Sequence, residues 1–420
     1  MRRLFVACVA VAVCVGGLGA RAPASAQLAT LAQPAAVAQP ATVGQPANPW
    51  SRDPHRLPAH GRAAAGVADR ATLFPLDRGW LGGDAAYSIP LGPGRILWLF
   101  GDTFTDLDHS GLRRWRDIVG NSVGISIKTP MGWETSFHYG MSSSGDALPF
   151  FRSDNPQIRY WPRHGFYDGE EVHVFLLKAL YTGVGPFGFE IVGSTLASFR
   201  PDAIGRGAPV TVDVPITYDD GVAPQGYVAG LAVARTGDQV LIYSIGASGT
   251  VFLNRYADGG FEYLASEEEA DAGNVWKPGL QGTDARAVLD AGASEFSVEY
   301  HPASRNWLMV YSDYDLASGK IWLRKARQPE GPWSDPILLY SVPELTGPGR
   351  LPFSFTYAAK SHPELESDAR LRVSYVVNLD EDPGDPAVYD QTDLWRILQP
   401  HYYGYYVPRL VALRVPLTND

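Results

Sequence analysis

Short runs of apolar, aromatic and β-branched residues recur along most of the chain, separated by glycine, proline, aspartate and asparagine. Residues 79–91 and 95–104 form the first pair of runs, and a Gly-Pro-Gly turn at 92–94 joins them. Two runs joined in this way predict an antiparallel hairpin. Helical periodicity is almost absent after Trp50, so the pattern predicts an all-β protein.

The runs fall into five units, each with a first strand, a turn, a strongly apolar second strand and one or two outer strands. The predicted strands are 79–91, 95–104 and 122–128; 160–166, 172–180 and 189–199; 227–234, 240–245 and 251–256; 295–300, 307–311, 321–326 and 337–340; and 355–360, 371–378 and 407–415. The units start about 60 to 70 residues apart, and such repeats are typical of β-propellers. We therefore predict a five-bladed β-propeller of four-stranded antiparallel blades. A pair of β-sandwiches would not explain the fixed strand order.

The first 48 residues differ from the rest of the chain. Residues 1–26 combine two arginines, an apolar run and a small-residue Ala-Ser-Ala site, which predicts a secretory signal peptide cleaved near Ala26. Residues 27–48 form an uncharged Ala/Gln/Pro-rich stretch with too little apolar surface to fold, so we expect a disordered linker. The propeller domain should span 49–420, and the mature protein should be secreted, either extracellular or periplasmic.

Charge narrows the range of partners. The formal net charge is −10, and no cluster of lysines and arginines interrupts the acidic composition, which argues against nucleic acid. No apolar run after the signal peptide is long enough to span a membrane. Both cysteines, Cys8 and Cys14, lie in the signal peptide, so the mature chain would depend on its core for stability. We expect a monomer.

In a propeller, the starts of the first strands and the ends of the second strands face one mouth of the central channel. Asp84 and Asp102 occupy such positions in the first hairpin, at the same end, and Glu295 does so in the fourth unit. The same rule collects further polar and aromatic residues: Trp161, Arg163, His164, Gln225, Asp313, Tyr357, Lys360 and Asn378. Polar groups that converge where a scaffold would prefer apolar ones predict a functional site.

Five segments together carry a resemblance to a known group of proteins. They are GGDAAYS at 82–88, LWLFGDT at 97–103, PEGPWS at 329–334, YAAKSHPE at 357–364 and SYVVN at 374–378. The chain resembles the secreted five-bladed propellers related to furanoside-cleaving glycoside hydrolases, a group of domains of unknown function that includes endo-D-arabinanases. The resemblance covers about residues 79–415.

A glycoside hydrolase needs two carboxyl groups, one to protonate the leaving oxygen and one to act as nucleophile or base. The resemblance implies that Asp84 or Asp102 is the nucleophile or base and that Glu295 is the acid. Asp313 is a fallback third acid. The alternatives are structural: Asp102 would cap the turn after its strand, and Glu295 would be a solvated strand end.

The predicted substrate-binding residues also have structural alternatives. Lys360 would hold a sugar hydroxyl or pair with a buried aspartate, and the same choice applies to Arg163 and His164. Trp161 and Trp276 would provide flat platforms for sugar rings, because loop aromatics often serve ligands whereas mid-strand ones pack between blades.

No motif for a metal or a cofactor is present. The nine histidines have no ligand spacing, so we assign no metal ligands and expect no cofactor. The acidic run 380–385 could hold calcium, but it lacks the glycine spacing of a calcium loop and also fits a solvated loop. A calcium ion in the channel, which relatives sometimes hold, stays open.

The residues and the resemblance together predict a secreted glycoside hydrolase. Its substrate would be a furanose-containing or other cell-envelope or plant polysaccharide, with arabinan favoured, cut by paired carboxylates at the channel mouth. The alternative is a non-catalytic propeller that binds carbohydrate or protein at the cell surface. The sugar, the linkage and the stereochemistry of cleavage do not follow from the sequence.

Overall fold

The computed structural model describes most of the chain from Leu73 onwards. The described residues are 73–76, 78–111, 113–181, 189–205, 209–214, 228–237, 239–246, 249–266, 275–282, 284–289, 293, 295–348, 354–365, 370–379 and 405–416. The predicted signal peptide, the linker, Gln225 and the acidic run 380–385 lie outside these residues.

Five antiparallel sheets follow one another along the chain, and each is one blade. Blade one contains β2 (Tyr87–Pro90), β3 (Arg95–Phe100), β6 (Ser122–Thr129) and β7 (Gly132–His138). Blade two contains β10 (Ile158–Tyr167), β11 (Val172–Tyr181), β12 (Phe189–Phe199) and β13 (Val210–Asp213). Both blades have the predicted four strands in simple sequential order.

The remaining blades vary this plan. Blade three contains β14 (Val228–Thr236), β15 (Gln239–Ile245), β16 (Val251–Ala257), β17 (Gly260–Leu264) and β18 (Trp276–Pro278), with β19 (Ala287–Leu289) beside β16. Blade four contains β20 (Phe296–His301), β21 (Asn306–Ser312), β22 (Lys320–Ala326) and β23 (Ile337–Ser341). Blade five contains β24 (Ser354–Ser361), β25 (Arg370–Leu379) and β26 (Arg409–Arg414). Blade five therefore has three strands within the described residues.

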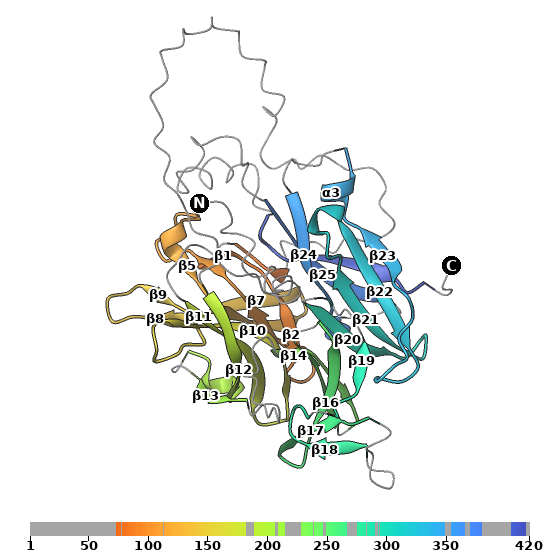
Figure 1. Ribbon diagram of the computed structural model, residues 1–420. Coiled ribbons are helices and arrows are strands. Elements are labelled where there is room, and N and C mark those ends of the chain that lie inside the picture. Colours follow the sequence, from red (N-terminus) through yellow and green to blue (C-terminus); the bar gives the residue numbers. More distant parts are fainter. Residues whose placement is uncertain are drawn as a thin grey trace, which may run out of the picture.

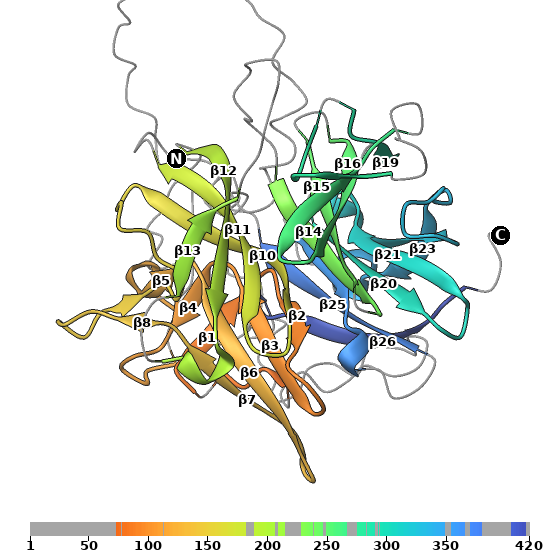
Figure 2. The ribbon, with the colours of Figure 1, turned by 90° about the horizontal axis from the view of Figure 1, so that it is seen from below.

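The blades are arranged in sequence order around a central axis, with blue blade five next to orange blade one (Figure 1, Figure 2). The first strands of blades one to five, β2, β10, β14, β20 and β24, contact one another in turn. Apolar clusters fill the spaces between adjacent blades, such as Ile89 and Leu99 with Val174 and Leu176 between blades one and two. Each blade thus buries its faces against its neighbours, and the prediction of a five-bladed all-β propeller is confirmed.

Polar side chains close the ring between its first and last blades. Ser88 Oγ of β2 lies 2.7 Å from His362 Nδ1, and the Lys360 ammonium donates to the Ala85 carbonyl at 2.8 Å. Lys360 and His362 are almost fully buried. Buried hydrogen bonds thus join the first blade to the last one.

A smaller sheet lies beside blade one and was not predicted. It contains β1 (Trp80–Gly83), β4 (Thr103–Thr105) and β5 (Ile118–Val119). The predicted strand 79–91 is divided into β1 and β2 because Ala85 and Ala86 adopt the left-handed conformation, with φ of 64° and 53°. Alanine rarely adopts it, so the sequence does not signal this break.

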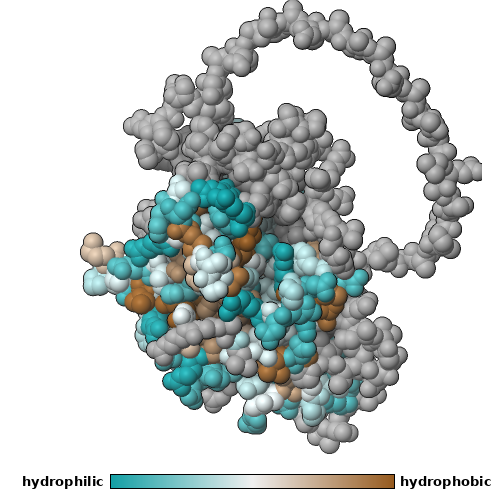
Figure 3. Space-filling view, turned by 90° about the vertical axis from the view of Figure 1, so that its left-hand side faces the viewer, coloured by the Kyte–Doolittle hydropathy of each residue, from teal (hydrophilic) through white to brown (hydrophobic). Residues whose placement is uncertain are grey.

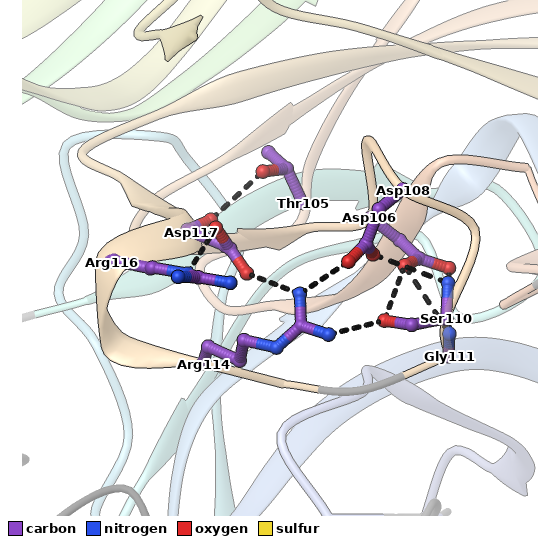
Figure 4. Close-up of polar contacts among 8 residues, drawn as sticks. All are labelled: Thr105, Asp106, Asp108, Ser110, Gly111, Arg114, Arg116 and Asp117. Carbon is purple, nitrogen blue, oxygen red and sulfur yellow. Dashed lines mark hydrogen bonds and ion pairs between the residues drawn. The ribbon is translucent and has the colours of Figure 1, made fainter.

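The loop between β4 and β5 is held by its own ion pairs (Figure 4). Arg114 donates to Asp108 at 2.7 Å and to Asp117 at 3.3 Å, while the carboxylate of Asp106 accepts from the Gly111 backbone. Asp117 belongs to the 3-10 helix η2 (Trp115–Asp117). The network shapes the chain just before β5.

The other short elements are peripheral. They are the hairpin of β8 (Gly140–Met141) with β9 (Ala147–Leu148), the 3-10 helices η3 (Pro201–Ala203), η4 (Leu316–Ser318) and η5 (Pro363–Leu365), and the single turn α3 (Pro343–Thr346). Among the residues described, no helix is long and apolar enough to cross a membrane.

Candidate active site

Asp84 lies between β1 and β2, and its side chain is 3% exposed. Its Oδ2 atom faces the hydroxyls of Tyr357, at 3.1 Å, and Tyr406, at 3.2 Å. A Cβ atom on Gly101 would overlap Asp84 Oδ1, so this position needs glycine. Tyrosines from the C-terminal part of the chain and a glycine from blade one therefore enclose the carboxyl group.

The Asp84 carboxyl is poised to be protonated. Burial, the charge of Asp102 and the charge of Glu295 raise its pKa to about 8, although the two tyrosine hydroxyls act in the opposite direction. A carboxyl in an apolar setting beside like charges favours its neutral form. At neutral pH Asp84 therefore carries a proton that it can donate.

Glu295 has the opposite environment. Its Oε2 accepts from the Lys360 ammonium at 2.6 Å, and its Oε1 accepts from the Arg163 guanidinium at 3.2 Å. Burial alone would raise the pKa of this carboxyl, but Lys360 and Arg163 outweigh burial and lower it. Glu295 is therefore held as a carboxylate, a state that does not suit the proton donor's role implied by the family resemblance.

Lys360 is the centre of this charged group. Besides Glu295, its ammonium donates to the carbonyls of Ala85, at 2.8 Å, and Ala358, at 3.2 Å, and it lies 4.2 Å from the centre of the Tyr87 ring. The side chain is 1% exposed. A buried ammonium with carbonyl, carboxylate and aromatic partners holds blades one, four and five in register.

Asp102 is more accessible than Asp84. It follows β3, is half-buried, and its backbone carbonyl accepts from the Tyr406 hydroxyl at 2.9 Å. Its side chain lines a cleft of about 800 Å³ between blades one and two. Tyr406 thus spans the backbone of one aspartate and the carboxyl of the other.

The structure brings six predicted site residues into this one cluster. They are Asp84, Asp102, Arg163, Glu295, Tyr357 and Lys360. The expectation that Asp84 and Asp102 lie at the same end of the first hairpin agrees with their electrostatic interaction. Catalytic and substrate-binding roles for these residues stay predictions.

His164 and Asn378 lie inside the scaffold. His164 Nε2 is 3.0 Å from the Ser88 carbonyl, and its Nδ1 accepts from the Val233 amide at 2.9 Å. This pattern requires a neutral ring, and burial lowers the pKa of His164 to about 4. Asn378 is fully buried in β25 opposite Phe355. The position of His164 favours its structural alternative, and substrate binding by Asn378 stays a prediction.

The two predicted tryptophan platforms differ in position. Trp161 is 3% exposed and packs edge-on against Phe189 in the core shared by blades two to four. Trp276 lies in β18, four strands out from β14, with the Arg255 guanidinium 4.6 Å from its ring centre. At about 4.8 Å per strand it is roughly 19 Å from the inner strand.

Asp313 caps a turn after β21. Its carboxylate accepts from the Asp315 amide at 3.1 Å and from the Ser318 hydroxyl at 3.0 Å. Both contacts are local, as expected for an aspartate that starts a turn. Nothing in this arrangement places Asp313 with Asp84 and Glu295, so the fallback role has no support from the contacts.

Sequence reasoning did not assign two residues that build the site. Tyr406 is one of them, and its hydroxyl contacts the Asp84 carboxyl and the Asp102 carbonyl. Arg113 was not noted; it donates to the carbonyls of Leu81, at 2.7 Å, and Tyr405, at 2.8 Å. A Cβ atom on Gly82 would overlap the Tyr406 carbonyl. The residues Gly-Gly beside Asp84 were the only local signal of this close approach.

In the described part of the chain, no three histidine, cysteine, aspartate or glutamate side chains are grouped so that they could hold a metal ion.

The architecture and the buried carboxyl cluster define a five-bladed β-propeller with a candidate active site on its first blade. A crystal structure of a candidate hydrolase from Bacteroides ovatus ATCC 8483 is similar, with a TM-score of 0.56 and 16% identity over 80% of this chain and 86% of that one. The chain belongs to the family described as "Domain of unknown function (DUF5005)", whose model matches residues 70–403.

More distant similarities to solved structures include named glycoside hydrolases. Exo-β-1,3-galactanase from Phanerochaete chrysosporium, solved with β-1,3-galactotriose, has a TM-score of 0.41 and 9% identity over 80% of this chain and 64% of that one. The GH62 α-L-arabinofuranosidase domain of Coprinopsis cinerea has a TM-score of 0.40 and 12% identity over 81% and 98%. The search of curated proteins gave no significant match.

Proposed function

We propose that the protein is a glycoside hydrolase in which Asp84 is the proton donor and Asp102 is the partner carboxylate. The observation that carries this proposal is the raised pKa of Asp84 beside a second aspartate that lines a cleft. A carboxyl group with a perturbed pKa close to a cleft is a candidate for acid–base catalysis.

The chemistry needs two carboxyl groups in different protonation states. Asp84, neutral at pH 7, would protonate the glycosidic oxygen as the bond breaks. Asp102, next to the cleft, would attack the anomeric carbon or activate a water molecule. Two carboxyl groups in different environments, one enclosed and one next to the cleft, can divide these roles.

Glu295 would act on Asp84 through its charge. It raises the Asp84 pKa, while Lys360 and Arg163 keep Glu295 ionised over the working pH range. We therefore assign Glu295, Lys360 and Arg163 to positioning and to electrostatics. This assignment replaces the acid role that the family resemblance implies for Glu295.

The substrate class rests on the family resemblance. A furanose-containing polysaccharide, with arabinan first among the candidates, fits the group that the five sequence segments resemble. Such a substrate lies outside the cell, which agrees with the signal peptide proposed for residues 1–26.

The test is to measure sugar release by the wild-type protein and by Asp84→Asn and Asp102→Asn from arabinans, galactans and xylans. We expect each change to lower kcat by about 10²- to 10⁴-fold, because a positioned acid or base typically contributes that much. Asp202→Asn is the matched control: Asp202 is exposed in η3, and its loss should leave the rate unchanged.

The competing function is glycan binding without cleavage. A folded wild-type protein that binds a polysaccharide of the panel and releases no sugar from any of them would contradict the hydrolase and support that alternative.

A further inference from the structure

The cleft beside Asp102 has two walls of different origin. One wall is the chain at β5, including Val119 and Gly120, and the other is the start of β10 with the end of β11, including Arg159 and Tyr181. Its volume of about 800 Å³ is within the range of pockets that enclose small ligands. The cleft therefore leads from the surface between blades one and two to the proposed partner carboxylate.

The charge of this cleft is opposite to that of the whole protein. The chain has a net charge of −10, yet two arginines, Arg152 and Arg159, line the cleft against one acid, Asp102. Both arginines are exposed, and neither forms an ion pair with the described carboxylates. Two cations in one cleft that have no counterion among the described carboxylates would suit a ligand that supplies negative charge.

The guanidinium of Arg159 is held in place by an aromatic ring. Its guanidinium lies 4.0 Å from the centre of the Tyr181 ring, and Tyr181 packs against Phe189 at 5.6 Å between ring centres. Stacking fixes the plane of the guanidinium and leaves its N–H groups free to donate along the edge. A guanidinium ordered in advance binds a carboxylate or phosphate through two parallel hydrogen bonds.

The surroundings limit the kind of anion. The outer face of the molecule near β8 and β13 shows hydrophilic residues with small separate hydrophobic patches (Figure 3). The overall negative charge would repel a long polyanion such as nucleic acid, whose binding needs many cations. Two arginines in one cleft fit a chain of mostly neutral sugars that carries single charged groups.

We propose that the cleft binds an anionic glycan, with Arg152 and Arg159 holding a carboxylate or a phosphate ester on a sugar that lies in the same cleft as Asp102. This proposal deepens the hydrolase function and rests on it for the position of the scissile bond. The binding itself needs only the cleft, so it can be tested without any activity.

The experiment measures binding by calorimetry with three probes of equal length. They are an oligosaccharide with a single uronic acid residue, the same oligosaccharide after reduction of its carboxyl group, and a neutral oligosaccharide with a single phosphate ester. We expect at least one charged probe to bind 10-fold or more tightly than the reduced one, and salt to weaken that binding. The stronger charged probe identifies the carboxylate or the phosphate as the natural group.

Arginine variants locate the binding. Arg159→Gln and Arg152→Gln should each lower the affinity for the charged probe about 10-fold and leave the reduced probe unaffected. Arg95→Gln is the matched control, since Arg95 is an exposed arginine at the other end of β3 from Asp102. Circular dichroism checks that each variant folds.

The two proposals fail in different ways. Equal affinity for charged and reduced probes, or binding unchanged in both arginine variants, would overturn the anionic glycan while hydrolysis of neutral glycans still supported the enzyme. Tight, arginine-dependent binding of a charged probe without any sugar release would support the cleft and contradict the hydrolase.

Discussion

The burial of Asp84 makes the stability of the folded protein depend on pH. A carboxyl group whose pKa is raised in the folded state binds its proton more tightly there than in the unfolded chain. As the pH rises from about 4 to about 8, the unfolded chain loses this proton first, so the folded state loses stability over that range. This loss of stability is therefore present at neutral pH.

Asp84→Asn should therefore stabilise the protein at high pH. We expect the free energy of unfolding to rise by on the order of 5 kcal/mol at pH 8 and to change little at pH 4, since the pKa is raised by about four units and one unit corresponds to about 1.4 kcal/mol. Urea denaturation at the two pH values measures it. A gain of equal size at both values would show that proton binding is not its cause.

The β1–β4–β5 sheet determines where Tyr406 lies. Arg113, 4% exposed, connects the Leu81 carbonyl of β1 with the Tyr405 carbonyl, next to the tyrosine that contacts Asp84. Backbone carbonyls that lose such a partner while buried destabilise the fold. This small sheet thus couples the C-terminal segment to the site.

Arg113→Met should lower the free energy of unfolding by about 2 to 4 kcal/mol, because it leaves two buried carbonyls without this donor. Thermal and urea denaturation measure the loss. Arg116→Met is the control from the same loop (Figure 4): the Arg116 side chain is 74% exposed, and its replacement should change stability by less than about 0.5 kcal/mol. Similar losses in the two variants would contradict the specific role of Arg113.

The local sequence pattern predicts the strands, but it does not predict the contacts of the candidate site. The predicted run 189–199 coincides with β12, and 337–340 differs from β23 by one residue, because alternation and turn residues mark these boundaries. The partners of Glu295 are 132 and 65 residues away in other blades. Only the closed ring brings them together, so no local signal reports the ionised state of Glu295.

At the level of the complete ring, Ser88 joins three blades through two buried histidines. Its hydroxyl lies 2.7 Å from His362 Nδ1 of the last blade, and its carbonyl lies 3.0 Å from His164 Nε2 of the second. His362 also contacts the Ser374 hydroxyl through Nε2 at 2.7 Å. Burial lowers the pKa of His362 to about 3, so the side chain that joins the last blade to the first is a neutral imidazole.

The contribution of His362 should depend on acidity. Below pH 6.5 the unfolded chain takes up a proton that the folded ring does not, so stability from His362 falls as the pH falls. The destabilisation caused by His362→Gln should therefore be smaller at pH 5 than at pH 7 by on the order of 2 kcal/mol. A His362→Gln effect that is independent of pH would contradict this explanation.

The contacts of Asp84 form late during synthesis, because its partners lie near the C-terminal end of the chain. Its two tyrosine partners follow it by 273 and 322 residues, which corresponds to tens of seconds of synthesis. Until those residues arrive, Asp84 is a hydrated aspartate with an ordinary affinity for protons. The raised proton affinity of Asp84 therefore arises only when the last blade docks on the first, and an incomplete chain carries every residue of blade one without it.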